Sequence, residues 1–245
     1  MTKVTRFHSE ARQLRAQELL QVKALPLFSE MAPQHLESLL DAALLQQFPS
    51  HVDLIHEGRS ADFLHVLVDG LVEIFTEQDD AEWGITLVKP VSTFILAAVV
   101  SDQPYLNSAR TIRESRILLI PAERVRAVFD RDVAFARIVA RELALAYRGA
   151  VKKLKGYVAR SSVERLANWI LTEAHKDGAP AHILLPFDRG TLASHIGTTR
   201  ENLSRGLTQL TEHGVRVRGR EILIDRHDLL ETFARPQRLI DDPSA

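Results

Sequence analysis

The chain has 245 residues, of which 45% are hydrophobic and 26% charged, and its net charge is −1. This balance is typical of a globular protein with one large domain or two smaller ones. The chain contains no cysteine, which excludes disulfide bonds, thiolate metal sites and cysteine-ligated iron–sulfur clusters. No run of about 18 apolar residues predicts a membrane span, and no secretory signal opens the sequence. We therefore expect a cytoplasmic protein without a membrane partner.

The first half of the sequence predicts two helices followed by short strands. An amphipathic helix is expected over residues 9–24 and a second, shorter one after Pro33. Asp69-Gly70 is a strong hairpin signal, and residues 78–81 mark another turn. Many short strands with regular turns favour a barrel or jelly roll. The predicted strands are residues 51–55, 63–68, 71–75, 85–88 and 116–120.

From about Ala122 the hydrophobic spacing becomes helical. Apolar residues recur every three or four positions and form a narrow seam over several turns. Such a seam favours a helix that packs against a second copy of itself, as in a two-stranded coiled coil. An ordinary core helix is the alternative. The predicted dimer contacts are Val139, Leu143, Ala146, Ala150, Leu154 and Tyr157.

Two basic stretches, residues 148–160 and 189–220, stand out in an otherwise near-neutral chain. A local excess of arginine and lysine is what contact with phosphates requires, although a solvated helix face could also explain either stretch. Between them, Ser161 and Glu164 form a capping box that begins a new helix.

Residues 191–213 predict a helix, a turn and a second helix. Gly197 ends the first helix, and Thr198 or Thr199 caps the second, which begins at Arg200. One face of the second helix carries leucines and the other is polar. A glutamate beside two arginines favours readout of base edges, because it would repel the phosphate backbone. The predicted base contacts are Arg200, Glu201, Ser204 and Arg205.

Residues 215–224 predict a β-hairpin that follows the second helix as a wing. Its arginines are placed for phosphates rather than bases. The predicted contacts to the DNA backbone are Thr191, Thr199, Thr208, Arg216, Arg218 and Arg220.

The segment 191–219, with Arg-Glu-Asn-Leu-Ser-Arg at 200–205, resembles the DNA-binding end of the cAMP receptor protein and fumarate-nitrate reduction regulator (CRP/FNR) family. Residues 56–72 resemble the family's glycine-marked barrel hairpin, and the helix before Ser161 resembles its dimer helix. The resemblance implies an α+β fold with a β jelly-roll sensor, a long dimerisation helix and a winged helix-turn-helix. The expected domains are a helical extension (1–24), the sensor (25–121), the dimerisation helix region (122–158) and the DNA-binding domain (159–245).

The resemblance implies a homodimer that binds a palindrome in double-stranded DNA, with recognition helices about 34 Å apart. It also implies contact with RNA polymerase, as an activator or, alternatively, a repressor. Glu201, Ser204 and Arg205 match the family's Glu-x-x-Ser-Arg motif, which resembles readers of a TTGA-type half-site. Arg200 is more like the branch that reads TGTGA, so the half-site stays open. A signal at the barrel would shift the dimer helix and a hinge at residues 156–160.

The sensor lacks the residues that bind a cyclic nucleotide in the family. The corresponding stretch, residues 94–109, has no Gly-Glu pair and no arginine before Ser108. A phosphate there would be desolvated without a cation, so we expect no cyclic-nucleotide binding. The apolar stretch 94–100 is more similar to the nitric-oxide-responsive branch. Haem is an alternative ligand, with His8, His56 and His65 as candidate axial residues.

Two other functions are compatible with parts of the sequence. A jelly roll with His51, His56 and His65 could form a metal-dependent, cupin-like enzyme, but the closely spaced histidine pair typical of such sites is absent. A ligand-binding interaction module without DNA binding is the other alternative. We expect a regulator and no enzymatic activity.

Overall fold

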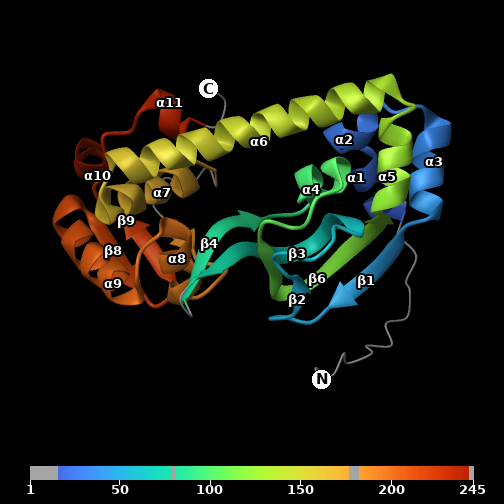
Figure 1. Cartoon of the computed structure of the whole chain (residues 1–245). Coiled ribbons are helices and arrows are strands. Elements are labelled where there is room, and N and C mark those ends of the chain that lie inside the picture. Colours follow the sequence, from blue (N-terminus) through green and yellow to red (C-terminus); the bar gives the residue numbers. More distant parts are fainter. Residues whose placement is uncertain (1–15, 79–80, 177–181, 243–245) are drawn as a thin grey trace. The chain divides into compact units, whose positions relative to one another are not determined.

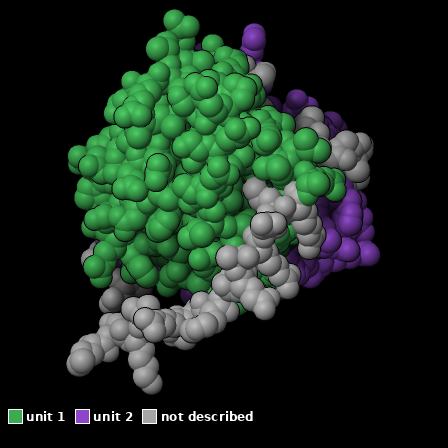
Figure 2. Space-filling model, turned by 90° about the vertical axis from the view of Figure 1, so that its right-hand side faces the viewer, with its two compact units in different colours: residues 1–77, 86–144 green, residues 78–85, 145–245 purple. Residues whose placement is uncertain are grey.

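A computed structural model of the chain describes residues 16–78, 81–176 and 182–242. The first predicted helix is therefore described only from Ala16, as α1 (Ala16–Lys23). The chain forms two compact units, residues 1–77 with 86–144 and residues 78–85 with 145–245 (Figure 2). Among the described residues, no helix is long and apolar enough to cross a membrane.

The boundary between the two units lies within α6 (Val133–Ala159), which Figure 1 shows as one unbroken helix. The expected domain boundaries at residues 121 and 158 flank this helix instead. The difference arises because the two halves of α6 belong to different units.

The first six strands form one antiparallel sheet with the order β1-β6-β3-β4, in which β2 also pairs with β6 and β5 with β3 (Figure 1). Its central strands β3 and β6 carry fully buried aliphatic residues, among them Leu64, Leu67 and Ile117. The strands are β1 (Leu44–Phe48), β2 (Asp53–Ile55), β3 (Phe63–Gln78), β4 (Ala81–Val88), β5 (Ser92–Phe94) and β6 (Ser108–Pro121).

Short helices pack beside this sheet. The helices α3 and α5 contact each other and β6, and α4 packs against α5. The contacts of α3 with α5 and β6, and of α4 with α5, join segments that are far apart in the chain. The remaining helices of this unit are α2 (Pro26–Ser29), α3 (Pro33–Asp41), α4 (Leu96–Ser101) and α5 (Ala122–Phe129).

The predicted hairpin at Asp69-Gly70 is wrong, because β3 continues through both residues. Gly70 adopts a φ of 113° at an irregularity in the register between β3 and β6. A Cβ atom at Gly70 would overlap the side chain of Ser115, whose hydroxyl accepts a hydrogen bond from the Leu71 amide at 3.2 Å. The glycine therefore permits a β-bulge and a close approach to β6 rather than a turn.

The second unit contains a helical bundle and a small sheet of order β7-β9-β8. Its central helix α7 contacts α8, α9 and α10, and Gly206 of α9 lies against α7, where a Cβ would be 3.4 Å from Val163 Cγ2. The elements are α7 (Ser162–Lys176), β7 (His182–Leu184), α8 (Arg189–Ile196), α9 (Arg200–Gln209), η1 (Leu210–His213), β8 (Val215–Arg218), β9 (Glu221–Ile224), α10 (His227–Ala234) and α11 (Arg238–Asp241).

The capping box before α7 is confirmed. The Ser161 amide donates to Glu164 Oε2 at 2.8 Å, and the Glu164 amide donates to Ser161 Oγ at 3.2 Å. The hydrogen bonds that the Glu164 carboxylate accepts from the Ser161 amide and hydroxyl lower the pKa of Glu164. The reciprocal pair satisfies two amides at the start of α7 and fixes where this helix begins.

Asp132 links the start of α6 to α3. Its carboxylate accepts hydrogen bonds from the amides of Phe135 (3.0 Å) and Ala32 (3.1 Å), and it lies 2.8 Å from Nδ1 of His35. The hydrogen bond with His35, followed by those from the two amides, lowers the pKa of Asp132 to about 2. Because only the carboxylate accepts all three, the ionised form stabilises this junction.

We expect Asp132→Asn to lower the free energy of unfolding by roughly 1–2 kcal/mol at neutral pH. The folded-state pKa lies below the unfolded value, so this contribution is complete above about pH 4 and is lost as the pH falls towards 2. Thermal unfolding followed by circular dichroism at several pH values measures it. Asp130→Asn, at the exposed end of α5, is the control and should change little. An equal loss at pH 7 and pH 2 would contradict the assignment.

Candidate nucleic-acid interface

Local hydrogen bonds fix both ends of α8 and the start of α9. Asp188 caps α8 by accepting from the Thr191 amide at 2.8 Å, and Gly197 ends that helix with a φ of 72°. Thr199 caps α9 by accepting from the Asn202 amide at 3.2 Å, which decides between the two threonines considered from the sequence. The three-residue turn between the helices thus has a defined geometry.

Helix α9 has one buried and one exposed face. Leu203, Gly206 and Leu207 are buried, and the polar residues on the other side are exposed. At 100° per residue, the exposed residues of α9 that were predicted to contact DNA lie within a sector of about 140°. The structure therefore brings the four predicted base contacts together on one accessible surface. These four are Arg200, Glu201, Ser204 and Arg205, and Thr208, which was predicted to contact the DNA backbone, lies on the same surface.

Arg200 differs from the other members of this surface because it has a partner on α8. Its Nη2 lies 3.9 Å from Asp188 Oδ2, and its guanidinium covers Gly190, where a Cβ atom would overlap it. Both side chains of the ion pair are largely exposed, so the pair is weak. Arg200 is thus turned towards the start of α8, whereas Glu201 and Arg205 are exposed on α9 itself.

The wing is the hairpin β8–β9, and its three arginines have different surroundings. Arg216 forms a two-pronged ion pair with Asp225, at 2.9 and 2.5 Å, and the hydrogen bond from Arg216 lowers the pKa of Asp225. Arg218 is exposed on β8. Arg220 donates twice to the Leu185 carbonyl, at 3.0 and 2.7 Å. Arg220 therefore holds the end of β7 to the wing. The sequence predicted that this arginine contacts the DNA backbone.

Thr191 and Thr208 are two further residues predicted to contact the backbone. Thr191 is half-buried in the first turn of α8, and Thr208 is exposed but donates its hydroxyl hydrogen to the Ser204 carbonyl at 3.1 Å. Arg189, which was not predicted, donates to the Gly219 carbonyl at 3.2 Å and joins the start of α8 to the turn of the wing. Its place in the basic stretch 189–220 was the signal available from sequence.

Tyr157 at the end of α6 and Arg165 on α7 both contact the turn of the helix-turn-helix. The Arg165 guanidinium donates to the carbonyls of Ile196 (2.9 Å), Gly197 (3.0 Å) and Arg160 (2.8 Å). It also lies 4.8 Å from the centre of the Tyr157 ring. A Cβ at Gly197 would be 2.5 Å from Tyr157 Cε1. Tyr157 was predicted at a dimer interface, but its ring packs on the turn of its own chain.

The predicted apolar seam of α6 is buried at its first residue and exposed along the second half of the helix. Val139 is fully buried within its own unit, so it cannot belong to a dimer surface and that prediction is wrong. Leu143 is half-buried, whereas Ala146, Ala150 and Leu154 are exposed. The exposed apolar stripe of the second half was only partly predicted and consists of Tyr147, Ala150, Val151, Leu154 and Val158.

The sensor-like unit contains a buried ion pair where the sequence suggested no cation. Arg110 Nη2 lies 2.9 Å from Oε2 of buried Glu73, and its guanidinium lies 4.4 Å from the centre of the Phe75 ring. Two residues earlier, Ser108 Oγ accepts from the Glu57 amide at 3.1 Å. Arg110 was missed because only the residues before Ser108 were considered, and its partner lies on another strand.

The three histidines considered as haem ligands are not equivalent. His65 is buried on β3, with its ring centroid 5.1 Å from that of Phe94 and 6.4 Å from that of Tyr105, and burial lowers its pKa to about 4. His56 is exposed, and His8 lies outside the described residues. His51, which was considered only for the cupin-like site, is exposed as well. Within the described ranges, no group of three or more histidine or acidic side chains could hold a metal ion.

Two protein-family models match separate parts of the chain. Residues 45–132 match the cyclic nucleotide-binding domain and residues 164–233 match the Crp-like helix-turn-helix domain. Together they cover more than half of the chain. The first match ends at the start of α6, and the second begins in α7 and includes the wing.

Two curated proteins are similar over most of the chain. The cyclic AMP receptor protein of Thermus thermophilus is 25% identical over 79% of this chain and 89% of its own length. The cAMP-activated global transcriptional regulator CRP of Pasteurella multocida is 22% identical over 77% and 93%. The structure of FixK2 from Bradyrhizobium japonicum matches 80% of this chain and 98% of that one, with a TM-score of 0.69 and 20% identity, and supports the fold. With a cyclic nucleotide-binding-type β-roll, a long helix and a Crp-like helix-turn-helix in this order, the chain is a DNA-binding transcription regulator of the CRP/FNR type.

Proposed function

We propose that the chain acts as a homodimer that binds a palindromic DNA site in a sequence-specific manner. The observation that carries this proposal is the exposed polar face of α9, which sits on a buried leucine face and begins at a fixed N-cap. An α-helix of this kind fits the major groove, with its N-terminal residues next to the base edges. The wing follows directly in sequence, and its Arg218 would contact the phosphates. Arg216 would do so once a phosphate replaces its present partner, Asp225.

Base readout is assigned to Glu201, Ser204 and Arg205. Arginine suits guanine through paired hydrogen bonds to O6 and N7, and glutamate accepts from cytosine N4. Arg200 reaches a base only if it leaves Asp188, so the Glu-x-x-Ser-Arg set, which resembles readers of a TTGA-type half-site, is the better supported alternative.

Arg205→Ala tests the assignment. We expect it to weaken binding to the operator by about 1–3 kcal/mol per half-site, because one bidentate base contact is lost. The operator is first selected from a random pool, and affinities are then measured by fluorescence anisotropy at fixed salt. Arg124→Ala, at an exposed position on α5, is the control. Equal affinity of both variants for operator DNA would contradict the base contact of Arg205. If no operator can be selected from the pool, the interaction module without DNA binding is favoured.

The dimer interface is assigned to the exposed apolar stripe in the second half of α6. These side chains recur at helical spacing, and their exposure in a single chain leaves apolar area that a second copy would cover. Leu154 is central to the stripe and 61% exposed. Leu145 is 58% exposed, but nine residues earlier it lies about 180° around the helix.

Leu154→Asp should therefore shift the protein from dimer to monomer, because it places a charge on each side of the buried stripe. Its matched control is Leu145→Asp, which should leave the dimer intact. Light scattering coupled to size-exclusion chromatography measures the mass of both. If the Leu145 variant dissociates instead, a different face of α6 forms the interface. We expect at least a tenfold weaker association for the Leu154 variant, which corresponds to about 1.4 kcal/mol.

Coupling between the dimer helix and the DNA-binding domain is assigned to the contact of Tyr157 and Arg165 with the turn at Gly197. Arg165 also binds the Arg160 carbonyl at the hinge, so one guanidinium joins α6, the hinge and the turn. A shift of α6 would move the turn and thereby the spacing of two recognition helices. This is the population shift expected from the sequence.

For the sensor we propose that no cyclic nucleotide binds, despite the family's name. The chain has no Gly-Glu pair in residues 94–109, part of which forms α4. The nearby cation, Arg110, is already neutralised by Glu73. A phosphate would have to displace a buried carboxylate, which costs several kcal/mol. Haem on His65 would require displacement of the Phe94 and Tyr105 rings, so a different signal or a constitutive regulator is favoured.

Isothermal titration with cAMP tests the sensor proposal. We expect no heat of binding at micromolar concentrations and no change in operator affinity when cAMP is added. Micromolar affinity would overturn the proposal while leaving DNA recognition by α9 untouched. Footprinting with RNA polymerase on the selected operator tests whether the two proteins are in contact. Transcription from the same DNA shows whether that contact leads to activation.

A further inference from the structure

Helix α8 begins with a carboxylate that contacts two different groups. Oδ1 of Asp188 accepts the capping hydrogen bond from the Thr191 amide at 2.8 Å, and Oδ2 lies 3.9 Å from Nη2 of Arg200, the first residue of α9. The hydrogen bond from Thr191 and, less strongly, the charge of Arg200 lower the pKa of Asp188, so this carboxylate is ionised at neutral pH. The cap therefore keeps a negative charge in place beside the arginine.

Gly190, two residues after the cap, leaves room for the Arg200 guanidinium. A Cβ atom at this position would lie 2.5 Å from Nε and 2.6 Å from Cζ of Arg200, far inside van der Waals contact. The backbone itself does not require glycine here, because Gly190 is part of α8 and its φ is not positive, unlike that of Gly197. Alanine would favour a helix more than glycine does. What the structure uses at Gly190 is therefore the space that Arg200 fills.

Together, Asp188 and Gly190 form a seat that turns the Arg200 side chain from α9 towards the start of α8. Arg200 begins the exposed face of α9, one turn before Ser204, and the first residues of such a helix lie next to base edges in the major groove. An arginine at that position suits guanine through two hydrogen bonds to O6 and N7. To form them, Arg200 has to give up its ion pair and its contact with Gly190, which offsets part of the free energy gained from the base.

We propose that Asp188 and Gly190 are positioning residues that set the base specificity of α9. They hold the Arg200 side chain against α8, so a guanine within its reach adds little to the affinity, and the readout falls to the other predicted base contacts of α9. This inference rests on the base readout proposed above. The two residues act through Arg200 and need no contact with DNA of their own.

Asp188→Asn removes the charge of the seat and keeps the cap, because the side-chain oxygen of asparagine also accepts from the amide. We expect this variant to select guanine at one more base pair of the half-site than the unsubstituted protein does. Each full-length protein first selects its operator from a random pool. Fluorescence anisotropy then measures its affinities for two DNAs that differ only at that base pair.

The ratio of these two affinities is the quantity that tests the seat. In Asp188→Asn it should increase in favour of guanine by about two- to fivefold per half-site, which is the range of an exposed ion pair. The loss of an acidic group near the phosphates raises the affinity for both DNAs equally and cancels in the ratio.

Gly190→Ala removes the seat by a different route, since it changes no charge. Its Cβ displaces a guanidinium at the end of a flexible side chain, so we expect the same increase in guanine preference. In an Arg200→Ala background neither substitution should change the ratio, because the arginine through which both act is gone. An unchanged ratio in Asp188→Asn or in Gly190→Ala, or a change that persists without Arg200, overturns the proposal.

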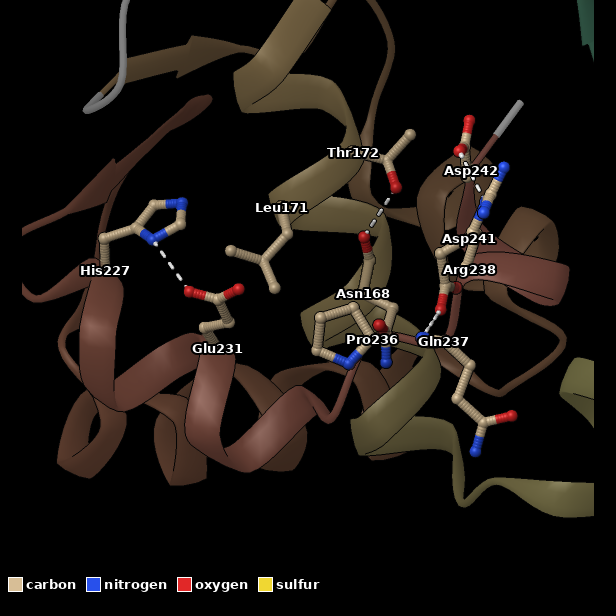
Figure 3. Close-up of a pocket in the computed structure, with 10 residues that line it drawn as sticks. All are labelled: Asn168, Leu171, Thr172, His227, Glu231, Pro236, Gln237, Arg238, Asp241 and Asp242. Atoms are coloured by element: carbon tan, nitrogen blue, oxygen red, sulfur yellow. Dashed lines mark hydrogen bonds and ion pairs between the residues drawn. The ribbon is translucent and has the colours of Figure 1, made fainter. Parts of the chain in front are cut away.

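Glu231→Gln is the control for the loss of one negative charge from the same unit. Glu231 is exposed in the wall of a pocket between α7, α10 and α11, where it faces His227 at 3.8 Å (Figure 3). None of the predicted DNA contacts lines this pocket, so the selected sequence and the ratio should stay the same. A new preference for guanine in this variant as well would assign the effect to charge alone and overturn the role of the seat.

The same selection separates a failure of this inference from a failure of DNA recognition by α9. If the unsubstituted protein enriches no sequence, the proposed readout fails and this inference fails with it. If the protein enriches a half-site that Arg205→Ala no longer binds, and the ratio is unchanged in both α8 variants, the readout stands and only the role of Asp188 and Gly190 fails.

Discussion

The close contact between the Tyr157 ring and Gly197 is the constraint on which the DNA-binding unit depends. Gly197 has to be glycine for two independent reasons, since it adopts a positive φ and leaves no room for a Cβ beside the ring. The first reason sets the turn between α8 and α9. The second sets where the end of α6 lies against that turn. A single position therefore determines both the geometry of the turn between α8 and α9 and the contact of that turn with α6.

Arg165 stabilises this arrangement from the other side. Its half-buried guanidinium donates three hydrogen bonds to carbonyls and stacks on the Tyr157 ring. Burial lowers the pKa of Arg165, but the group stays charged. The carbonyls at the end of α8 and at the hinge thereby gain a donor that the backbone does not supply. In the first unit Arg110 instead pairs with a buried carboxylate, that of Glu73.

The features predicted correctly from sequence are those that depend on neighbouring residues. The capping box at Ser161, the helix stop at Gly197 and the cap at Thr199 each involve hydrogen bonds within three or four residues. The errors involve partners far along the chain. The sequence predicts a turn at Gly70 because the close contact of this glycine with Ser115 cannot be read from neighbouring residues. It predicts a dimer contact at Val139 because the burial of this residue in the core of its own unit cannot be read in this way either. Arg110 was missed for the same reason, because Glu73 lies on another strand, and the contact of Arg220 with Leu185 was not foreseen from the sequence.

The ion pairs of Arg200 with Asp188 and of Arg216 with Asp225 have a consequence for the thermodynamics of DNA association. Most basic DNA-binding surfaces gain affinity when phosphates are neutralised and condensed salt ions are released into solution. Here two arginines beside the recognition helix already carry a carboxylate of their own. A DNA phosphate that replaces this carboxylate exchanges one anion for another. Less binding free energy is therefore gained on DNA of arbitrary sequence. Release of salt ions at these two arginines would therefore add less to the affinity for DNA than it would at arginines without a carboxylate partner.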